Sequence, residues 1–304
     1  MHALRGVSLR IEEGETFGVV GESGSGKSTL ALAVAHLLDD RVAKYTGGMI
    51  NLLGVDMLKA PRSTVNRLRG TGIFMVFQDP FLSLDPLETV GSQLLEAISV
   101  RMKRASLHFD REEAVQMAMN SLESVRIGDA RQILRRYPHQ LSGGQNQRVM
   151  LAMAVAESPK LLIADEPTTA LDVTTQGQVL NLLKEIVDQT KMSVLYITHD
   201  LAVAGSLCDR IAVLYGGLVQ EVGPTKEILL SPEHPYTAGL IASIPSKSKK
   251  DGSLKAITGS FSWKDAEDKC AFAPRCPYAR EVCLSGTPAL IPRGERLVRC
   301  VNYA

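Results

Sequence analysis

Short apolar runs alternate with longer segments of helical spacing along most of the chain. The runs at 15–20 (ETFGVV), 161–167 (LLIADEP) and 193–200 (SVLYITHD) are largely apolar. A continuous apolar run is typical of a parallel strand that is buried on both faces. The segment TLALAVAHLL (29–38) has instead the apolar spacing of a helix. The alternation predicts an α/β fold.

Further strands are expected within GVSLRI (6–11), GMINLLG (48–54) and TGIFMVFQD (71–79). The segment IAVLYGGLVQEV (211–222) predicts a hairpin, because two glycines between apolar runs suit a two-residue turn. Helices are expected over about 174–189, after SVLYITHD, and after LSGGQ, where Pro159 would end the helix.

Composition changes twice along the chain. From about 80 to 145 the sequence is rich in charged, helix-favouring residues, which predicts an inserted helical subdomain. Beyond Gly223, prolines punctuate a segment that we expect to be irregular; they are Pro224, Pro232, Pro235, Pro245, Pro274, Pro277, Pro288 and Pro292. We therefore expect a main domain over 1–223 and a C-terminal extension over 224–304.

Length and charge restrict the class of protein. The 304 residues suffice for one large domain with a small appendage, and 45% of them are apolar. A net charge of +1 argues against general binding to nucleic acid, which needs a basic excess. No apolar run approaches the roughly 18 residues of a spanning helix, and no signal peptide opens the sequence. We expect a soluble cytosolic chain that meets a membrane only through a partner.

The stretch GESGSGKST fits the phosphate-binding pattern G-x-x-x-x-G-K-[ST]. Its glycines let backbone N–H groups turn toward phosphates, and the following helix adds the positive end of its dipole. Lys27 would reach the β- and γ-phosphates, and the Ser28 hydroxyl would ligate Mg²⁺. The strand before it and the helix after it make a chance glycine-rich turn a poor explanation. The nucleotide-binding candidates are Gly21, Glu22, Ser23, Gly24, Ser25, Gly26, Lys27, Ser28 and Thr29.

Two carboxylates follow the apolar run at 161–164. Asp165 would hold Mg²⁺, and Glu166 would orient and polarise the attacking water. Alone, this pair is equally compatible with a helix cap. Upstream, LSGGQ opens a helix and offers a hydroxyl and unhindered N–H groups, which make a second phosphate cradle. One chain does not need two cradles for one nucleotide, so the second would grip a phosphate bound to another subunit.

With these motifs in this order, the sequence resembles the ATP-binding subunits of ABC transporters along nearly its whole length. Gln78 matches the Q-loop, which contacts Mg²⁺ and water; Asp172 matches the D-loop, and His199 matches the switch histidine. A lone histidine at a strand end is more often structural, but here it completes an ordered set. The resemblance implies a RecA-like core with an antiparallel β subdomain and an inserted α-helical subdomain.

The resemblance also implies a pair of ATPase subunits that enclose two ATP molecules. Each site would combine Lys27, Gln78, Asp165, Glu166 and His199 of one chain with residues of the other. The residues that would act in trans are Ser142, Gly143, Gly144, Gln145 and Asp172. Mg²⁺ would be held by Ser28, Gln78 and Asp165. The reaction would be hydrolysis of ATP, with Glu166, His199, Gln78 and Lys27 as the catalytic set.

Three longer segments, FQDPFLSLDP, YPHQLSGGQ and HPYTAGLIASIP, resemble the dipeptide and oligopeptide importer ATPases of the nickel/peptide group. This implies two permease subunits, a second ATPase subunit, more often a different chain than a copy, and an extracytoplasmic binding protein. The chain would lie peripherally on the cytoplasmic face of the membrane. Nickel or oligosaccharides are alternative cargoes. A soluble ABC ATPase acting on nucleic acid or ribosomes is the rival class, but duplicated cassettes and basic arms are missing.

Four of the five cysteines lie in the last 35 residues. Cys270, Cys276, Cys283 and Cys300 have the spacing C-x5-C-x6-C-x16-C, and four thiolates suit either a 4Fe–4S cluster or Zn²⁺. Some members of the group that this sequence resembles hold a 4Fe–4S cluster at a similar set of C-terminal cysteines, and this resemblance favours a structural iron–sulfur site. Free thiols or disulfides are the alternative. Cys208 is expected to be an ordinary buried residue.

The family usually has an aromatic residue on an early strand that stacks on adenine. No aromatic residue stands there in this sequence, and His2 is a poor substitute. A start further upstream and weaker adenine binding both explain the difference, so we assign no adenine-stacking residue.

Overall fold

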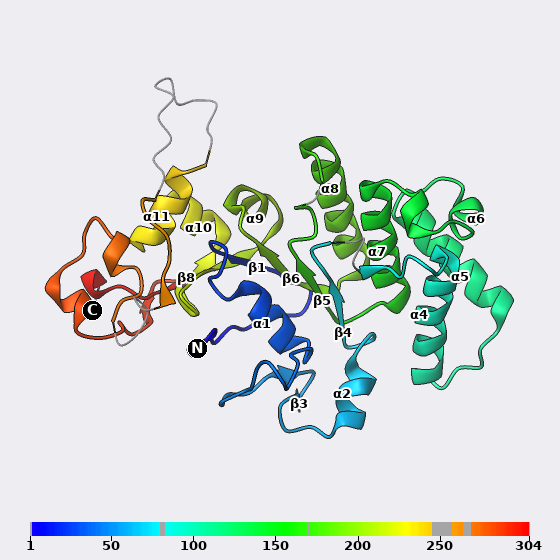
Figure 1. Cartoon of the computed structure of the whole chain (residues 1–304), viewed down its shortest axis with the longest axis horizontal. Helices are drawn as coiled ribbons and strands as arrows, with labels where there is room; N and C mark the ends of the chain where they lie inside the picture. The colour runs from blue at the N-terminus through cyan, green and yellow to red at the C-terminus, as the bar shows by residue number, and fades with distance from the viewer. Residues whose placement is uncertain (1, 80–82, 170, 245–256, 264–268, 304) are drawn as a thin grey trace. The chain divides into compact units, whose positions relative to one another are not determined.

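A computed structural model describes residues 2–79, 83–169, 171–244, 257–263 and 269–303. The chain forms two compact units. The first comprises residues 1–11, 15–31 and 196–304, and the second comprises 12–14 and 32–195. Figure 1 colours the chain by residue number, from blue at the N-terminus to red at the C-terminus. In the described residues, no helix is long and apolar enough to span a membrane.

The first unit contains a mixed β-sheet. Strand β1 (Thr16–Val20) runs parallel to β7 (Arg210–Tyr215), and β7 pairs antiparallel with β8 (Leu218–Pro224). Beyond β8 lie β10 (Arg296–Val298) and β9 (Ile291–Arg293), both antiparallel to their neighbours. Since β1 is wholly buried and β7 nearly so, this sheet forms the centre of the unit.

Helices of the first unit connect and flank these strands. They are α9 (Leu201–Leu207), α10 (Thr225–Leu230) and α11 (Pro235–Ala242). The C-terminal part of the chain contains short 3-10 turns, which are η3 (Ala273–Arg275), η4 (Glu281–Leu284) and η5 (Val301–Tyr303). The unit boundary falls within α1 (Lys27–Val34) and within the buried strand β6 (Ser193–Thr198).

The second unit pairs β4 (Ile73–Val76) with β5 (Leu161–Asp165) in parallel, in the register Ile73 to Leu161. A small antiparallel hairpin consists of β2 (Asn51–Leu52) and β3 (Val55–Asp56), and α2 (Arg62–Leu68) follows it. The continuous burial of β5 agrees with the expectation from its apolar sequence.

Helices account for more residues of the second unit than strands do. They are α4 (Val90–Arg104), α5 (Arg111–Ser124), α6 (Ala130–Ile133), α7 (Gly143–Glu157) and α8 (Val173–Thr190), with the 3-10 turn η1 (Pro138–Gln140) before α7. Helices α4, α5 and α7 pack against one another, and Figure 1 shows them side by side. Thr89 and Asp110 cap α4 and α5 by accepting N–H groups of their first turns. The helix-rich segment expected from the sequence is confirmed.

Two strand predictions were wrong in detail. Residues 6–11 form no strand, and Gly6 at the start of this segment has a left-handed φ of 89°. The expected strand at 48–54 is reduced to two residues, because Leu53 and Gly54 have φ of 54° and 81° and turn the chain into β3. A tight turn thus lies inside a run that composition alone predicts as extended.

The Gly-Gly hairpin is confirmed. Gly216 and Gly217 connect β7 to β8 with φ of 57° and 72°, as a two-residue turn with both positions left-handed requires. Among the described residues after Gly223, more lie in helices and strands than the prolines predict. Helices α10 and α11 begin it, and the β9–β10 hairpin extends the sheet from β8.

Candidate nucleotide-binding site

The phosphate loop lies between β1 and α1 in the first unit. Gly24 and Gly26 have φ of 79° and 105°, and α1 begins at Lys27. The Lys27 ammonium group is buried and donates to the carbonyl oxygens of Gly21 (2.8 Å) and Glu22 (3.1 Å). The loop therefore has the closed turn and the helix N-terminus that phosphate binding needs.

Close packing explains two of the glycines. A Cβ on Gly21 would lie 2.2 Å from the carbonyl oxygen of Leu214, at the end of β7. A Cβ on Gly26 would lie 2.8 Å from the carbonyl oxygen of Ala3. The Gly217 N–H also donates to the Ser25 carbonyl at 3.0 Å. The β7–β8 turn and the N-terminal segment thus hold the loop from outside.

His199 directly follows β6 and is exposed, in the same unit as the phosphate loop. The next residue, Asp200, caps α9 by accepting the N–H groups of Ala202 (2.8 Å) and Val203 (3.3 Å). The histidine is therefore placed at the junction of a buried strand and a capped helix, where its backbone is fixed.

The predicted carboxylates lie at the end of β5 in the second unit. Asp165 is buried as the last residue of the strand, and Glu166 follows it with a left-handed φ of 45°. The Thr169 hydroxyl donates to Glu166 Oε2 at 3.0 Å. A positive φ on a non-glycine residue is costly, and such positions cluster at functional sites.

Asp172 caps α8. Its carboxylate accepts the Thr175 hydroxyl at 2.6 Å and the N–H groups of Thr174 and Thr175. The side-chain hydrogen bond from Thr175, followed by the backbone bonds, holds the pKa of Asp172 below its usual value. The carboxylate is exposed and remains ionised at neutral pH. Gln78, just after β4, is also exposed.

The LSGGQ segment forms the N-terminus of α7. Ser142 Oγ accepts the Gln145 N–H (3.3 Å), and Gln145 Oε1 accepts the Ser142 N–H (3.0 Å), which is a capping box. Gly143 and Gly144 are the first residues of the helix. The exposed Ser142 and the glycine backbone lie where the sequence predicted a second anion cradle.

The residues therefore divide between the two units. The first unit brings together the phosphate loop, residues 21–29, and carries His199. The second unit carries Gln78, the capping segment 142–145, Asp165, Glu166 and Asp172.

Sequence reasoning missed two side chains that contact the phosphate loop. Arg275 binds the Glu22 carboxylate through two nitrogens, and the Tyr236 hydroxyl accepts the Glu22 N–H at 2.9 Å. Tyr236 lies in the segment HPYTAGLIASIP, and Arg275 directly precedes Cys276. These positions were the only hint, and no local pattern links either residue to a loop more than 200 residues earlier.

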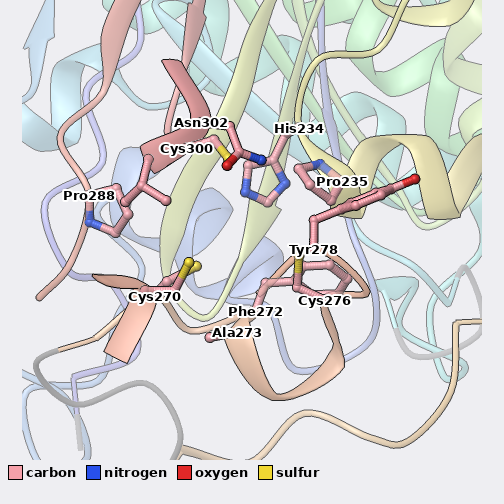
Figure 2. A pocket seen from close by; sticks show the side chains of 12 residues that line it. His234, Pro235, Cys270, Phe272, Ala273, Cys276, Tyr278, Pro288, Cys300 and Asn302 are labelled. Carbon is pink, nitrogen blue, oxygen red and sulfur yellow. The ribbon is translucent and has the colours of Figure 1, made fainter. Parts of the chain in front are cut away.

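All four C-terminal cysteines line one cavity of about 20 Å³ (Figure 2). Burial raises the pKa of the Cys270, Cys276 and Cys300 thiols. Backbone hydrogen bonds oppose this at each sulfur, from Phe272 and Ala273, from Tyr278, and from Asn302 respectively. The Arg280 N–H points to Cys283 Sγ at 3.4 Å. Within the described residues, no group of three or more His, Cys, Asp or Glu side chains is arranged to hold a metal ion.

His234 lines the same cavity without being a free ligand. Burial lowers the pKa of His234 to about 3, so the ring is neutral. Its Nδ1 accepts the Tyr236 N–H at 3.0 Å, and a hydrogen bond to the backbone of Arg299 engages the ring as well. The donor set of the cavity is therefore four sulfurs. Cys208 lies outside it and is buried, as expected.

Comparison with known proteins gives two family matches. The family described as ABC transporter matches residues 4–169, and the one described as oligopeptide/dipeptide transporter, C-terminal region, matches residues 220–283. The chain is 42% identical to the oligopeptide transport ATP-binding protein AppD of Bacillus subtilis, over 99% of this chain and 91% of that protein. It is also 42% identical to the probable D,D-dipeptide transport ATP-binding protein DdpD of Escherichia coli, over 100% and 91%.

Solved structures agree with these matches. A dimeric ATP-binding cassette bound to ADP and phosphate superposes with a TM-score of 0.63 at 30% identity, covering 73% of this chain and 90% of that one. The CbiO1 protein of Clostridium perfringens, part of an ABC transporter complex, gives 0.63 at 28% identity, covering 75% and 84%.

Proposed function

The chain belongs to the ABC transporter family, and from this we propose that it is the ATP-hydrolysing subunit of an importer for di- and oligopeptides. The observation that carries the substrate class is the match of residues 220–283 to the oligopeptide/dipeptide transporter C-terminal region. Similarity to peptide transport proteins over nearly the whole chain supports it. Nickel or oligosaccharides as cargo, and a soluble role on nucleic acid, have no comparable support.

The proposed reaction is transfer of the γ-phosphoryl group of ATP to water. Residues 21–29 cradle the phosphates and Lys27 neutralises their charge, and Ser28, Gln78 and Asp165 would hold Mg²⁺. The metal would neutralise charge on the phosphate oxygens. Glu166 orients and polarises the attacking water, and His199 contacts the γ-phosphate. These roles follow from the place of each residue in the family's motifs.

A second ATPase subunit would be needed to complete each nucleotide site. Ser142, Gly143, Gly144, Gln145 and Asp172 would act on ATP bound to the opposite ATPase subunit. Ser142, which caps α7, is exposed, and a cassette of similar fold forms a dimer. We propose a heterodimer of two different ATPase chains in preference to a homodimer.

The remaining partners follow from the import role. Two permease subunits would hold the ATPase pair at the cytoplasmic face of the membrane, and an extracytoplasmic binding protein would deliver the peptide. We place the division between the ATPase domain and the Cys- and Pro-rich extension near Gly223, with a helical subdomain over about 80–145.

We further propose that Cys270, Cys276, Cys283 and Cys300 hold a metal group. The donor chemistry fits, because four thiols line one cavity and backbone N–H groups face the sulfurs, although within the described residues the thiols are not arranged to hold a metal ion. A 4Fe–4S cluster is our first assignment, with a structural role. Zn²⁺ is the alternative, since a cavity of about 20 Å³ is close to the size of one small group.

Metal analysis of the chain purified without oxygen tests this site. We expect about four iron and four sulfide per chain, with broad visible absorption from thiolate–iron charge transfer. Cys276→Ser should lose most of the iron, whereas Cys208→Ala, which changes a cysteine outside the cavity, should keep it. About one zinc per chain without colour selects the alternative. If the purified chain contains neither iron nor zinc, the proposed metal site is refuted.

Purification from detergent-solubilised membranes tests the assembly. We expect two permeases and a second ATPase chain to accompany the tagged protein, identified by mass spectrometry. The matched sample is the soluble fraction of the same cells. Recovery only in that fraction, together with ribosomes or nucleic-acid enzymes, would contradict the transport role while leaving the ATPase chemistry in place.

A further inference from the structure

Glu22 is the point where the phosphate loop meets the C-terminal segment. Its carboxylate accepts two hydrogen bonds from Arg275, with Nη1 to Oε2 at 2.7 Å and Nη2 to Oε1 at 3.0 Å. Its N–H donates to the Tyr236 hydroxyl at 2.9 Å. Its carbonyl oxygen accepts from the Lys27 ammonium group at 3.1 Å. One residue thus links the phosphate-binding lysine to two side chains from beyond residue 230.

Arg275 is held on every side of its guanidinium group. Its side chain is only 7% exposed, Nη1 also donates to the Tyr215 hydroxyl at 3.1 Å, and Nε donates to the Thr258 carbonyl at 2.9 Å. The guanidinium carbon lies 5.7 Å from the centre of the Tyr215 ring. A planar fork that is fixed in this way binds a carboxylate in one geometry.

The cysteine cavity and this arginine share one short segment. Arg275 ends the 3-10 turn η3, which lies between Cys270 and Cys276. In the same core, Tyr236 is fully buried, with its ring 4.5 Å from that of Tyr215 and 5.2 Å from that of Phe272. The two cysteines pack against that core. The segment 270–300, called the cysteine segment below, therefore carries Arg275, and its Phe272 packs against Tyr236.

Charge explains why these contacts matter. A phosphate loop attracts anions through its N–H groups, its lysine and the helix dipole, and a carboxylate on the loop opposes that attraction. The Glu22 carboxylate is part of this loop and half-buried, so water screens it incompletely. Arg275 supplies the opposite charge at hydrogen-bonding distance.

We propose that Arg275 and Tyr236 are positioning residues for the phosphate loop. Arg275 neutralises the Glu22 carboxylate, Tyr236 fixes the Glu22 amide, and the C-terminal cysteine segment thereby sets the affinity for nucleotide. This inference rests on the ATP-binding role proposed above. It assigns the segment a function in the ATPase site in addition to any metal it holds.

Nucleotide binding by the purified full-length chain tests the proposal, with Mg²⁺ and a fluorescent ATP analogue as the probe. Arg275→Ala should raise the Kd by about 10- to 100-fold, the usual range for a charge-assisted hydrogen bond. The KM of ATP hydrolysis should rise in parallel, while kcat at saturating ATP stays within about twofold. The Kd of Arg275→Lys should lie between those of the unchanged chain and Arg275→Ala, because Lys keeps the positive charge but cannot bind the carboxylate through two nitrogens.

Glu22→Gln separates charge from shape without altering the C-terminal segment. Glu22→Gln combined with Arg275→Ala should recover most of the affinity for nucleotide that Arg275→Ala alone loses. Arg280→Ala is the matched control, because Arg280 lies in the same cysteine segment and contacts Asn302 and the Val301 carbonyl. It should leave the Kd unchanged. Tyr236→Phe should raise the Kd by about 2- to 10-fold.

Trp263, the only tryptophan of the chain, packs against the same core, so its emission reports whether the segment stays folded in each variant. Unchanged affinity in Arg275→Ala would overturn the proposal. The proposal would also be overturned if adding Glu22→Gln to Arg275→Ala did not restore the affinity. The same holds if kcat fell while KM stayed constant, since that result indicates a smaller folded fraction. If the unchanged chain binds no ATP, the proposed function itself fails, which is a distinct result.

Discussion

Replacing Glu166 by Gln is expected to lower ATP turnover by roughly 100- to 10,000-fold, the usual contribution of a general base. Nucleotide binding should be retained. The side chain follows the buried Asp165, has a left-handed backbone, and accepts the Thr169 hydroxyl at 3.0 Å. Gln keeps that shape and one acceptor but cannot take a proton from water. Phosphate release and equilibrium binding of ATP, measured on the same preparation, check the prediction.

Glu185→Gln is a suitable control for this variant. Glu185 is an exposed carboxylate of α8 that pairs with Arg126 at 2.7 Å, so its change removes a surface ion pair of small energy. Its ATPase rate should match that of the unchanged chain. A rate near that of the unchanged chain in Glu166→Gln would contradict the assignment of Glu166 as the residue that activates water.

Replacing Gly21 by Ala is expected to abolish nucleotide binding and to lower the free energy of unfolding by about 3 kcal/mol. The added Cβ would lie 2.2 Å from the carbonyl oxygen of Leu214 and 2.9 Å from Ser25 Oγ. The Leu214 backbone belongs to the central strand β7 and cannot move aside easily. The loop must shift instead, which displaces the N–H groups that would contact phosphate. Thermal unfolding and ATP binding measure the two effects.

Gly24→Ala provides the comparison within the same loop. Gly24 has a left-handed φ of 79° but no atom within 4 Å of the position of a Cβ. Only backbone strain remains, which costs about 1 kcal/mol. Gly24→Ala should therefore be clearly more stable than Gly21→Ala. Equal destabilisation of the two variants would contradict the role of packing against β7.

The local parts of the site could be predicted from the sequence because each depends on a short pattern. The start of α1 at Lys27, the start of α7 after Ser142 and the end of β5 at Asp165 all follow from residues within a few positions. The Gly216–Gly217 hairpin is of the same kind. In each case the backbone conformation is set by the glycine, the cap or the apolar run itself.

The parts that were missed depend on contacts between distant segments. The turn at Leu53 needs a non-glycine residue in a left-handed conformation, which composition does not predict. The β9–β10 hairpin pairs with β8, and Arg296 adds ion pairs to Glu221 and Glu233, which are more than 60 positions away. The Arg275–Glu22 pair joins residues 253 positions apart, and no spacing rule reaches that far.

The central claim is that hydrolysis of ATP by this chain drives peptide import. The most direct measurement is the ATPase rate of the complete transporter in lipid nanodiscs, with its extracytoplasmic binding protein added with and without short peptides. We predict that peptide-loaded binding protein stimulates hydrolysis and that the Glu166→Gln complex does not respond. Stimulation by nickel or oligosaccharide in place of peptide, or an ATPase rate indifferent to every loaded binding protein, would contradict the account.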